Sequence, residues 1–249
     1  MRLFLADLHI HTALSPCAEN EMTPPAIVKA AKAKGLAIIG ICDHNSAENV
    51  LSVIRAGAAE GVMVLGGIEV QTVEDVHVLT FFPRVDALIS WQEEIHSALP
   101  DIENDEARFG EQLVMDSHGK VTRKLCTLLL ASTSMSVDYV GKRVRELEGL
   151  VIPAHVDRPS FSLIRNLGFV PDRLRPCCME ISRNISAEEA RDRFPSIARF
   201  PFVRSSDAHR PSEIAAYTEI PMEDARWDEL LLALNFTGGR YIAPRDATI

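Results

Sequence analysis

The sequence contains no apolar run that could span a membrane and no cysteine pair with CxxC spacing. Its longest apolar runs are short pieces such as Leu36–Cys42, whereas a membrane-spanning helix needs ~20 apolar residues. The five cysteines are an odd number, and Cys177 and Cys178 are adjacent. The acidic residue Asp7 follows Met1 too closely for a signal peptide. We therefore expect no structural disulfides, no zinc ribbon, no membrane partner and a cytoplasmic location.

Basic residues are also few, with 26 Lys and Arg against 35 Asp and Glu in 249 residues, a net charge of −9. This balance argues against binding of extended duplex nucleic acid, although it leaves room for a local phosphate pocket. Hydrophobic residues make up 47% and charged residues 24% of the chain, which excludes a disordered protein. No linker rich in Gly, Ser or Pro interrupts the sequence. We expect one domain over residues 1–249 and leave the oligomeric state open.

Short apolar runs alternate with amphipathic ones along the chain. We expect helices at about 23–35, 45–60, 86–99, 136–149, 187–194 and 224–235, and strands at Leu3–Leu8, Leu36–Cys42, Val62–Val70, His77–Phe82, Leu150–Ala154, Cys178–Ile181 and Pro201–Arg204. This alternation predicts an α/β fold with parallel strands joined by crossover helices. The number of units, roughly seven, favours a closed β/α barrel over an open sheet. Residues 93–136 are the least regular, and we interpret them as an insertion that contains a hairpin around 116–119.

Polar residues gather where the predicted strands end or begin, and six of the eight histidines lie there: His9, His11, His44, His77, His155 and His209. Glu69 and Asp207 fall at such positions as well. In a β/α barrel, chemistry collects at the C-terminal ends of the strands. Side chains alternate along a strand, so His9 and His11 point to the same face. Imidazoles combined with a few carboxylates suit Zn, Mn, Fe or Co better than Mg or Ca.

These motifs, in this order, resemble the PHP (polymerase and histidinol phosphatase) superfamily: Asp7-Leu8-His9-Ile10-His11-Thr12, Cys42-Asp43-His44-Asn45, Glu69, Ala154-His155 and Ser206-Asp207-Ala208-His209. The resemblance implies a distorted seven-stranded, TIM-like β/α barrel with a trinuclear metal centre at its C-terminal face. It also implies metal-dependent hydrolysis of a phosphate ester. The expected substrate is a small phosphorylated metabolite, a nucleotide or a short oligonucleotide.

The same resemblance implies two to three divalent ions, of Zn, Mn or Fe, and their ligands. One ion would be held by His9, His11, Glu69 and Asp207. Glu69 would bridge to a second ion that His77 and His155 complete. A third would use His44, His209 and a ligand from the loop after His11.

That loop departs from the family pattern, because it reads Ser15-Pro16-Cys17-Ala18-Glu19 where relatives often supply Asp or His. A thiolate is a good ligand for Zn or Fe, so we expect Cys17 to complete the third site. Glu19 is the alternative ligand. If Cys17 binds no metal, we expect it to be simply a small buried residue of the fold. The departure leaves the occupancy of this site and the metal it prefers open.

Three acidic and two basic residues are candidates for roles beyond metal binding. Glu69 and Asp207 are expected to take part in catalysis. Asp43 is expected either to orient an imidazole, which we favour, or to act as the general acid. Arg158 and Arg183 follow predicted strands and are expected to clamp a phosphate, with surface ion pairs as the equal alternative.

Two other functions stay open at this point. A non-catalytic, metal-binding regulatory module would predict missing ligands, and only the position of Cys17 is unusual. Amidohydrolase barrels also begin with His-x-His, yet no lysine here follows a predicted strand where it could be the carboxylated ligand that they often use. The phosphoesterase hypothesis accounts for more of the residues than either alternative.

Overall fold

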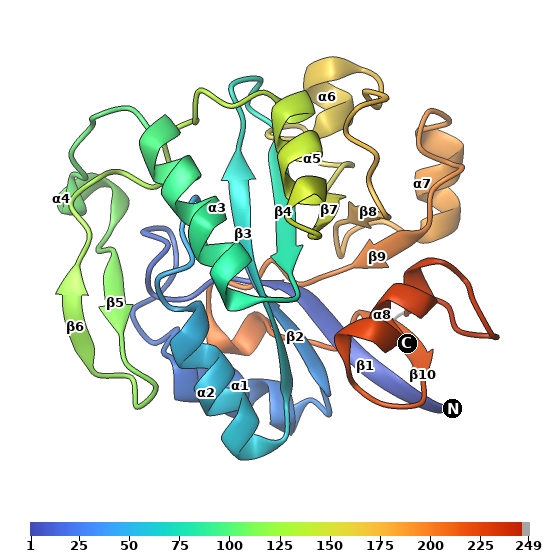
Figure 1. The fold of residues 1–249 in the computed structure, drawn as a ribbon, viewed down its shortest axis with the longest axis horizontal. Helices are drawn as coiled ribbons and strands as arrows, with labels where there is room; N and C mark the ends of the chain where they lie inside the picture. Colours follow the sequence, from blue (N-terminus) through green and yellow to red (C-terminus); the bar gives the residue numbers. More distant parts are fainter. Residues whose placement is uncertain (246–249) are drawn as a thin grey trace.

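The structure is a computed structural model that describes residues 1–245. Its main sheet has seven strands in the order β11-β10-β1-β2-β3-β4-β7 and is strongly curled (Figure 1). The strands of this sheet are β1 (Arg2–Ile10), β2 (Ile38–Ile41), β3 (Met63–Gln71), β4 (His77–Phe82), β7 (Leu150–Pro153), β10 (Thr218–Met222) and β11 (Ala243–Pro244). Strands β1, β2 and β3 are parallel. Strands β10 and β11 extend the sheet beyond β1, and the sequence pattern did not predict them.

Two further strands, β8 (Met179–Ile181) and β9 (Phe202–Arg204), pair in parallel and close the gap between β7 and β1. On the β7 side, the backbone N–H of Cys177 donates to the Val151 carbonyl at 3.1 Å. On the β1 side, Ile10 forms a parallel bridge with Ala208. Strands β1, β2, β3, β4, β7, β8 and β9 thus form a distorted seven-stranded barrel, which confirms the predicted fold class. The distortion follows from these two joins, which have far fewer ladder bonds than the continuous sheet.

The expectation that all strands are parallel was wrong. Strand β4 is antiparallel to both β3 and β7, and β10 is antiparallel to β1. Between β3 and β4 the chain has only the residues Thr72–Val76, too few for the crossover helix that a parallel pair requires. The consequence matters for the site, because His77 begins β4 and pairs in register with Gln71 at the end of β3. Both strands therefore present polar side chains at the same rim.

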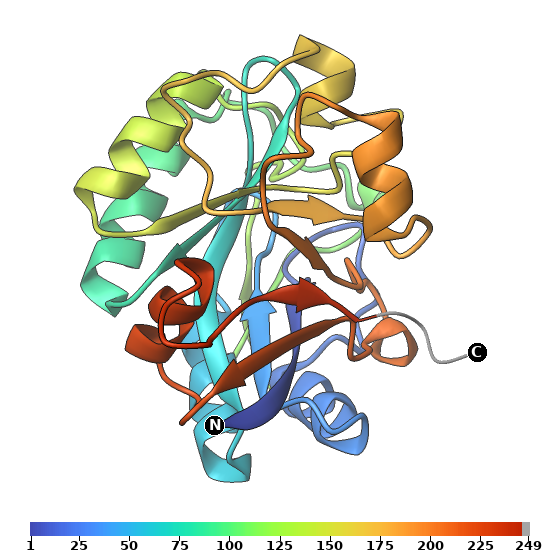
Figure 2. The same ribbon diagram turned by 90° about the vertical axis from the view of Figure 1, so that its right-hand side faces the viewer.

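The outer face of the sheet is covered by α2 (Val50–Glu60), α3 (Val85–Ala98) and α5 (Val137–Glu146), as Figures 1 and 2 show. Helix α1 (Pro24–Ala33) packs on α2 and begins as predicted, since Thr23 Oγ1 accepts the Ala26 N–H at 3.3 Å. Shorter helices are α6 (Leu163–Leu167), α7 (Ala187–Arg193), the 3₁₀ turn η1 (Pro211–Glu213) and α8 (Trp227–Leu234). None of the helices within residues 1–245 combines the length and apolar character that crossing a bilayer demands.

Helix α2 begins at Val50 rather than at the predicted residues 45–46. The Asn45 side chain is used elsewhere: its amide nitrogen donates to the carbonyls of Leu129 and Ala131, and its oxygen accepts the Gln71 N–H at 3.0 Å. Asn45 therefore ties the loop after β2 to the end of β3 instead of capping a helix.

The irregular segment begins later than predicted, because residues 93–98 belong to α3. Between α3 and α5 lie α4 (Glu106–Phe109) and the predicted hairpin, formed by β5 (Leu113–Met115) and β6 (Val121–Lys124). The hairpin docks beside α2, where the Asn49 side chain donates to the Leu113 carbonyl at 2.9 Å and accepts the Met115 N–H at 2.7 Å. That this segment is an insertion on a single domain stays a prediction.

Candidate metal centre

Glu69 lies at the centre of the histidine cluster. It is on β3 and 1% exposed. Its Oε1 lies 2.9 Å from Nδ1 of His77 and 3.3 Å from Nε2 of His155, and its Oε2 lies 2.9 Å from Nδ1 of His44. Three imidazoles from three different segments therefore face one carboxylate. The sequence alone predicted that these residues share a rim, and the structure brings all four together.

His9 and His11 point to the same face of β1, as the alternation of side chains predicted. Their Nε2 atoms are 3.1 Å apart. Asp207 Oδ1 lies 3.4 Å from His9 Nε2 and 3.1 Å from His11 Nε2, and Glu69 Oε1 lies 3.4 Å from His9 Nε2. The four residues expected to hold the first ion, His9, His11, Glu69 and Asp207, therefore lie next to one another in the interior of the protein.

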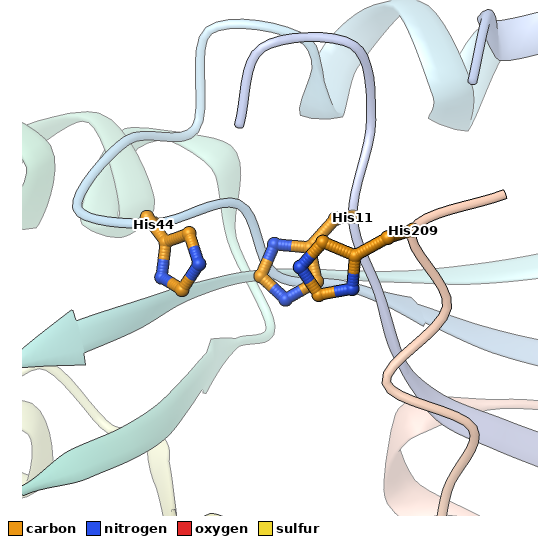
Figure 3. Close-up of side chains that lie close together, drawn as sticks. All are labelled: His11, His44 and His209. Carbon is orange, nitrogen blue, oxygen red and sulfur yellow. The ribbon is translucent and has the colours of Figure 1, made fainter. Parts of the chain in front are cut away.

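His11, His44 and His209 form a second group of imidazoles, which Figure 3 shows converging from the end of β1, the loop after β2 and the loop after β9. The ring centroids of His11 and His209 are 4.2 Å apart, and those of His11 and His44 are 4.6 Å apart. His11 and Glu69 also group with His9, and Glu69 and His44 also group with His77. The three groups therefore overlap through shared residues.

Of the two loop candidates for the third site, Cys17 lies at the histidines and Glu19 does not. Cys17 is exposed as a residue. Desolvation of its sulfur raises the thiol pKa, but the neighbouring His44 and His209 favour the thiolate and lower that pKa to about 6. Glu19 instead faces Arg210, with Oε1 3.4 Å from the Arg210 Nε. The charge environment therefore favours Cys17 over Glu19 as the candidate loop ligand.

Buried polar atoms without hydrogen-bond partners provide a test of whether this site fits a metal. Within the described residues they include Nδ1 of His44, Nδ1 of His77 and Oε2 of Glu69, because the 2.9 Å contacts of the two imidazoles with Glu69 lack hydrogen-bond geometry. Leaving such a group unpaired costs about 1–3 kcal/mol. One ligand atom from each of these three residues lies within 4.8 Å of the others. A divalent cation would satisfy them, and a set of imidazole and carboxylate donors suits Zn, Mn or Fe.

The electrostatics of two ligand residues, His11 and Glu69, agree with this test. Burial, together with His209 and His44, holds the pKa of His11 well below its usual value, so this imidazole is neutral as a metal ligand must be. Burial would raise the pKa of Glu69, but His77, His9 and His44 hold it well below its usual range. Glu69 is therefore an ionised carboxylate inside the protein. Burial would lower the pKa of His9, His44 and His209, but neighbouring acidic groups raise it above the usual value, so a bound cation would have to displace a proton from each.

The positions of His155 and Asp207 require an unusual backbone. Both have a positive φ, 30° for His155 and 52° for Asp207, in the left-handed region that disfavours residues with a Cβ. Such strain costs about 1–3 kcal/mol per residue and concentrates at functional sites. The strained turns lie where the chain leaves β7 and β9, and they direct both side chains into the cluster.

Glu180 lies on β8, is 1% exposed, and was not predicted from the sequence pattern. Its carboxylate lies 3.0 Å from Nδ1 of His9 and accepts the backbone N–H of His155 at 3.3 Å. It thereby directs the Nε2 of His9 toward Glu69 and Asp207. The available signal was a glutamate inside the apolar run Cys178–Ile181, where a buried carboxylate needs a partner.

Asp43 is buried and does not line the metal cavity, the small cavity bordered by His44, Glu69, His77 and His155. Its oxygens accept bonds from the Thr12 N–H and from the hydroxyls of Thr12 and Ser15, each at 2.7 Å. Ser15 Oγ in turn lies 2.9 Å from Nδ1 of His11. Asp43 thus acts on His11 through Ser15, so the geometry favours the orienting role and argues against direct proton donation.

The two arginine candidates are separated. The Arg158 guanidinium lies 2.6 Å from Asp207 Oδ2 and lines the metal cavity, which has a volume of about 130 Å³. Arg183 lies 3.9 Å from Glu213 with a side chain that is 45% exposed, and it does not line that cavity. The contact of Arg183 with Glu213 agrees with the ion-pair alternative, so only Arg158 remains a candidate for binding phosphate.

Comparison with known proteins gives several similarities. "Uncharacterized protein YqxK" of Bacillus subtilis is 24% identical over 275 residues, which cover 97% of this chain and 64% of the relative. A putative metal-dependent phosphoesterase from Bifidobacterium adolescentis has a TM-score of 0.55 and 21% identity, covering 82% of this chain and 87% of that one.

Two crystal structures of Endonuclease Q are also similar. The lesion-specific endonuclease PfuEndoQ from Pyrococcus furiosus has a TM-score of 0.72 and 22% identity, covering 97% of this chain and 58% of that one. A complex of Endonuclease Q with a 27-mer duplex that carries an abasic lesion has a TM-score of 0.70 and 20% identity, covering 96% of this chain and 58% of that one. The chain therefore spans about three fifths of the length of these relatives.

A family model matches more than half of the chain. It is described as the PHP domain, and it matches residues 7–157, from the start of the His-x-His motif to the loop after β7. The barrel, the histidine cluster and this match agree with one another. The chain belongs to the PHP domain family.

Proposed function

We propose that the protein is a metal-dependent phosphoesterase whose rim holds two to three divalent cations. The observation that carries this proposal is the overlap of three groups of ligand atoms through Glu69, His11 and His44. A single structural metal would need only one such group. Overlapping groups are typical of sites in which neighbouring cations act on one phosphate.

The ligands would divide as follows. His9, His11, Glu69 and Asp207 would hold one ion, Glu69 would reach a second with His77 and His155, and the third would lie among His44, His209 and Cys17. When bound, such cations neutralise phosphoryl oxygens and make an attacking water more acidic. Arg158, which lies 2.6 Å from Asp207 and lines the cavity, would donate to a phosphate oxygen at its mouth.

The substrate is proposed to be a small phosphorylated molecule, a nucleotide or a short oligonucleotide. The endonuclease names of two similar structures support a nucleic acid, and the phosphoesterase name of a third supports phosphate-ester chemistry. The duplex held by Endonuclease Q makes duplex DNA a compound to test. The expectation against extended duplexes rests on the net charge and stays a prediction.

The test is metal analysis of anaerobically purified protein, followed by turnover on histidinol phosphate, mononucleotides and short oligonucleotides. Asp207→Asn should abolish turnover and lower metal content while the circular dichroism spectrum stays unchanged. The exposed Asp101→Asn is the matched control. Metal-loaded protein that hydrolyses none of a broad phosphoester panel would overturn the proposal and favour a regulatory metal-binding module.

A further inference from the structure

The metal cavity is too small for a whole substrate. Its volume is about 130 Å³, whereas pockets that enclose a small molecule measure about 300–1,000 Å³. A cavity of this size has room for the reacting phosphate and little more. The rest of the substrate must lie against the surface that surrounds the mouth.

A second cavity, of about 540 Å³, adjoins the first, because Arg158 lines both. Two more arginines line it, Arg165 on α6 and Arg193 at the end of α7. Two larger cavities, between α3 and α5 and between α1 and α2, share no lining residue with the metal cavity. We call the second cavity the arginine groove.

The charge of the arginine groove is positive in a protein with a net charge of −9. Arg165 is exposed, and within the described part of the chain no carboxylate pairs with it. Arg193 stacks over the Phe194 ring at 5.4 Å, and its 61% exposed side chain makes one solvent-exposed contact with a carboxylate, 3.9 Å from Nη1 to Oε1 of Glu189, a pair that contributes little in water. The acid that lines the groove, Asp157, already accepts bonds from the Ser182 N–H and hydroxyl, each at 2.6 Å. Two guanidinium groups are therefore available to an anion.

Phe161 forms another part of the mouth of the metal cavity. One face of its ring stacks on His77, with centroids 4.7 Å apart and planes at 14°, yet the residue is 41% exposed. Its backbone has a positive φ of 53°, and its carbonyl accepts the His77 N–H at 2.9 Å. An aromatic ring is thus fixed at the mouth of the metal cavity by its stacking on His77, and it remains partly exposed to solvent.

We propose that Arg165 and Arg193 form a subsite for a second phosphate, and that Phe161 stacks a base of the same strand. A positive groove that continues from a catalytic site, together with an exposed aromatic ring, is how proteins hold single-stranded nucleic acid. The inference rests on the proposed function and narrows its substrate to an oligonucleotide with at least two phosphates. A phosphorylated monomer would leave the arginine groove empty.

The test measures binding by the metal-loaded protein. Fluorescein-labelled phosphorothioate oligothymidylates of one, two, four and eight nucleotides resist cleavage and report affinity by fluorescence anisotropy. Affinity should rise from one nucleotide to four in the unmodified protein. In Arg165→Gln/Arg193→Gln, the affinity for the tetramer should fall about tenfold. The slope of the logarithm of the binding constant against the logarithm of the salt concentration should become less negative by about 0.7, the value for one phosphate contact on a single strand.

Arg108→Gln/Lys142→Gln is the matched control, since both side chains are exposed and lie outside the arginine groove. Phe161→Leu should weaken binding of oligothymidylate about tenfold, the effect of losing one stacked base. It should leave binding of an abasic strand of equal length unchanged. The proposal would be overturned if the arginine variant and its control lost affinity equally, or if affinity did not rise with oligonucleotide length. Tighter binding of inorganic tripolyphosphate than of the strand would overturn it as well.

Turnover of bis(4-nitrophenyl) phosphate by the unmodified protein separates this inference from the proposed function. Hydrolysis of this small ester without length-dependent binding refutes the subsite and retains the phosphoesterase. Length-dependent binding that the arginine variant loses, without hydrolysis of any ester, retains the subsite and refutes the phosphoesterase.

Discussion

The carboxylate of Glu180 lies 3.0 Å from Nδ1 of His9, and both side chains are buried. This contact fixes which nitrogen of His9 faces the other ligands, because a hydrogen bond at one ring nitrogen leaves the second as the metal ligand. It joins β1 to β8 across the side of the barrel where ladder bonds are few. Glu180 is thus a positioning residue for the metal centre.

Replacing Glu180 tests this role. Glu180→Gln keeps the size of the side chain but removes its charge, and changes of this kind next to a metal ligand reduce metal affinity about 10–100-fold. We expect a loss in that range, measured by competition with a chelator, with little change in the far-ultraviolet circular dichroism spectrum. The exposed Glu188→Gln is the control. Unchanged metal affinity of Glu180→Gln would show that Glu180 does not position His9.

Cys17 is expected to bind the third metal. Partial desolvation of the sulfur would raise the pKa of this thiol, but His44 and His209 favour the thiolate and lower the pKa to about 6. Protein loaded with cobalt should therefore show a sulfur-to-metal charge-transfer band that Cys17→Ser lacks. Cys126→Ser, at another exposed cysteine, should keep the band. If the band survives in Cys17→Ser, the third site does not use this thiolate.

Gly40 is required for the close approach of β2 to β1. A Cβ at this position would lie 2.8 Å from the carbonyl carbon and 2.9 Å from the Cα of Leu8. Because backbone cannot yield as a side chain does, we expect Gly40→Ala to destabilise the protein by about 3 kcal/mol and to weaken metal binding at the adjacent His9. At Gly66 the new Cβ meets side-chain atoms of Val50 and Leu88. Urea unfolding should therefore show a smaller loss for Gly66→Ala.

Glu229 and Arg240 join α8 to the chain that follows it, with Oε2 2.7 Å from Nε and Oε1 2.9 Å from Nη2. Hydrogen bonds from Arg240 and from the Glu223 N–H lower the pKa of Glu229 from 4.5 to about 2. A carboxyl group whose pKa is lower in the folded protein than in the unfolded chain stabilises the fold at pH values above the unfolded pKa. This stabilisation is lost as the pH falls toward the folded pKa.

Glu229→Gln should therefore lower the urea midpoint at pH 7, and the difference from the unmodified protein should shrink progressively between about pH 4.5 and 2. Unfolding curves at pH 7 and pH 3.5 measure this. Glu188→Gln serves as the exposed control. A difference that stays constant with pH would mean that packing, and not the charge of Glu229, stabilises this contact.

Local pattern was sufficient to predict the barrel and most of the metal cluster. Alternation along β1 placed His9 and His11 on one face, and the apolar runs before His44, Glu69, His155 and Asp207 marked strands that end at one rim. Residues whose partners come from distant segments were harder to predict. Asn45 resembled a helix cap in sequence, but it hydrogen-bonds to the end of β3 and to the loop before α5.

The sequence by itself determined the family, the class of fold and the candidate ligand residues, because these follow from residue type, motif order and short-range spacing. The tertiary structure decided that His77 joins the rim through an antiparallel strand, that Glu180 directs His9, and that Arg158 lies at the cavity while Arg183 does not. The physical reason is that strand direction and side-chain contacts depend on how segments far apart in the chain pack, and spacing within one segment carries no record of that packing.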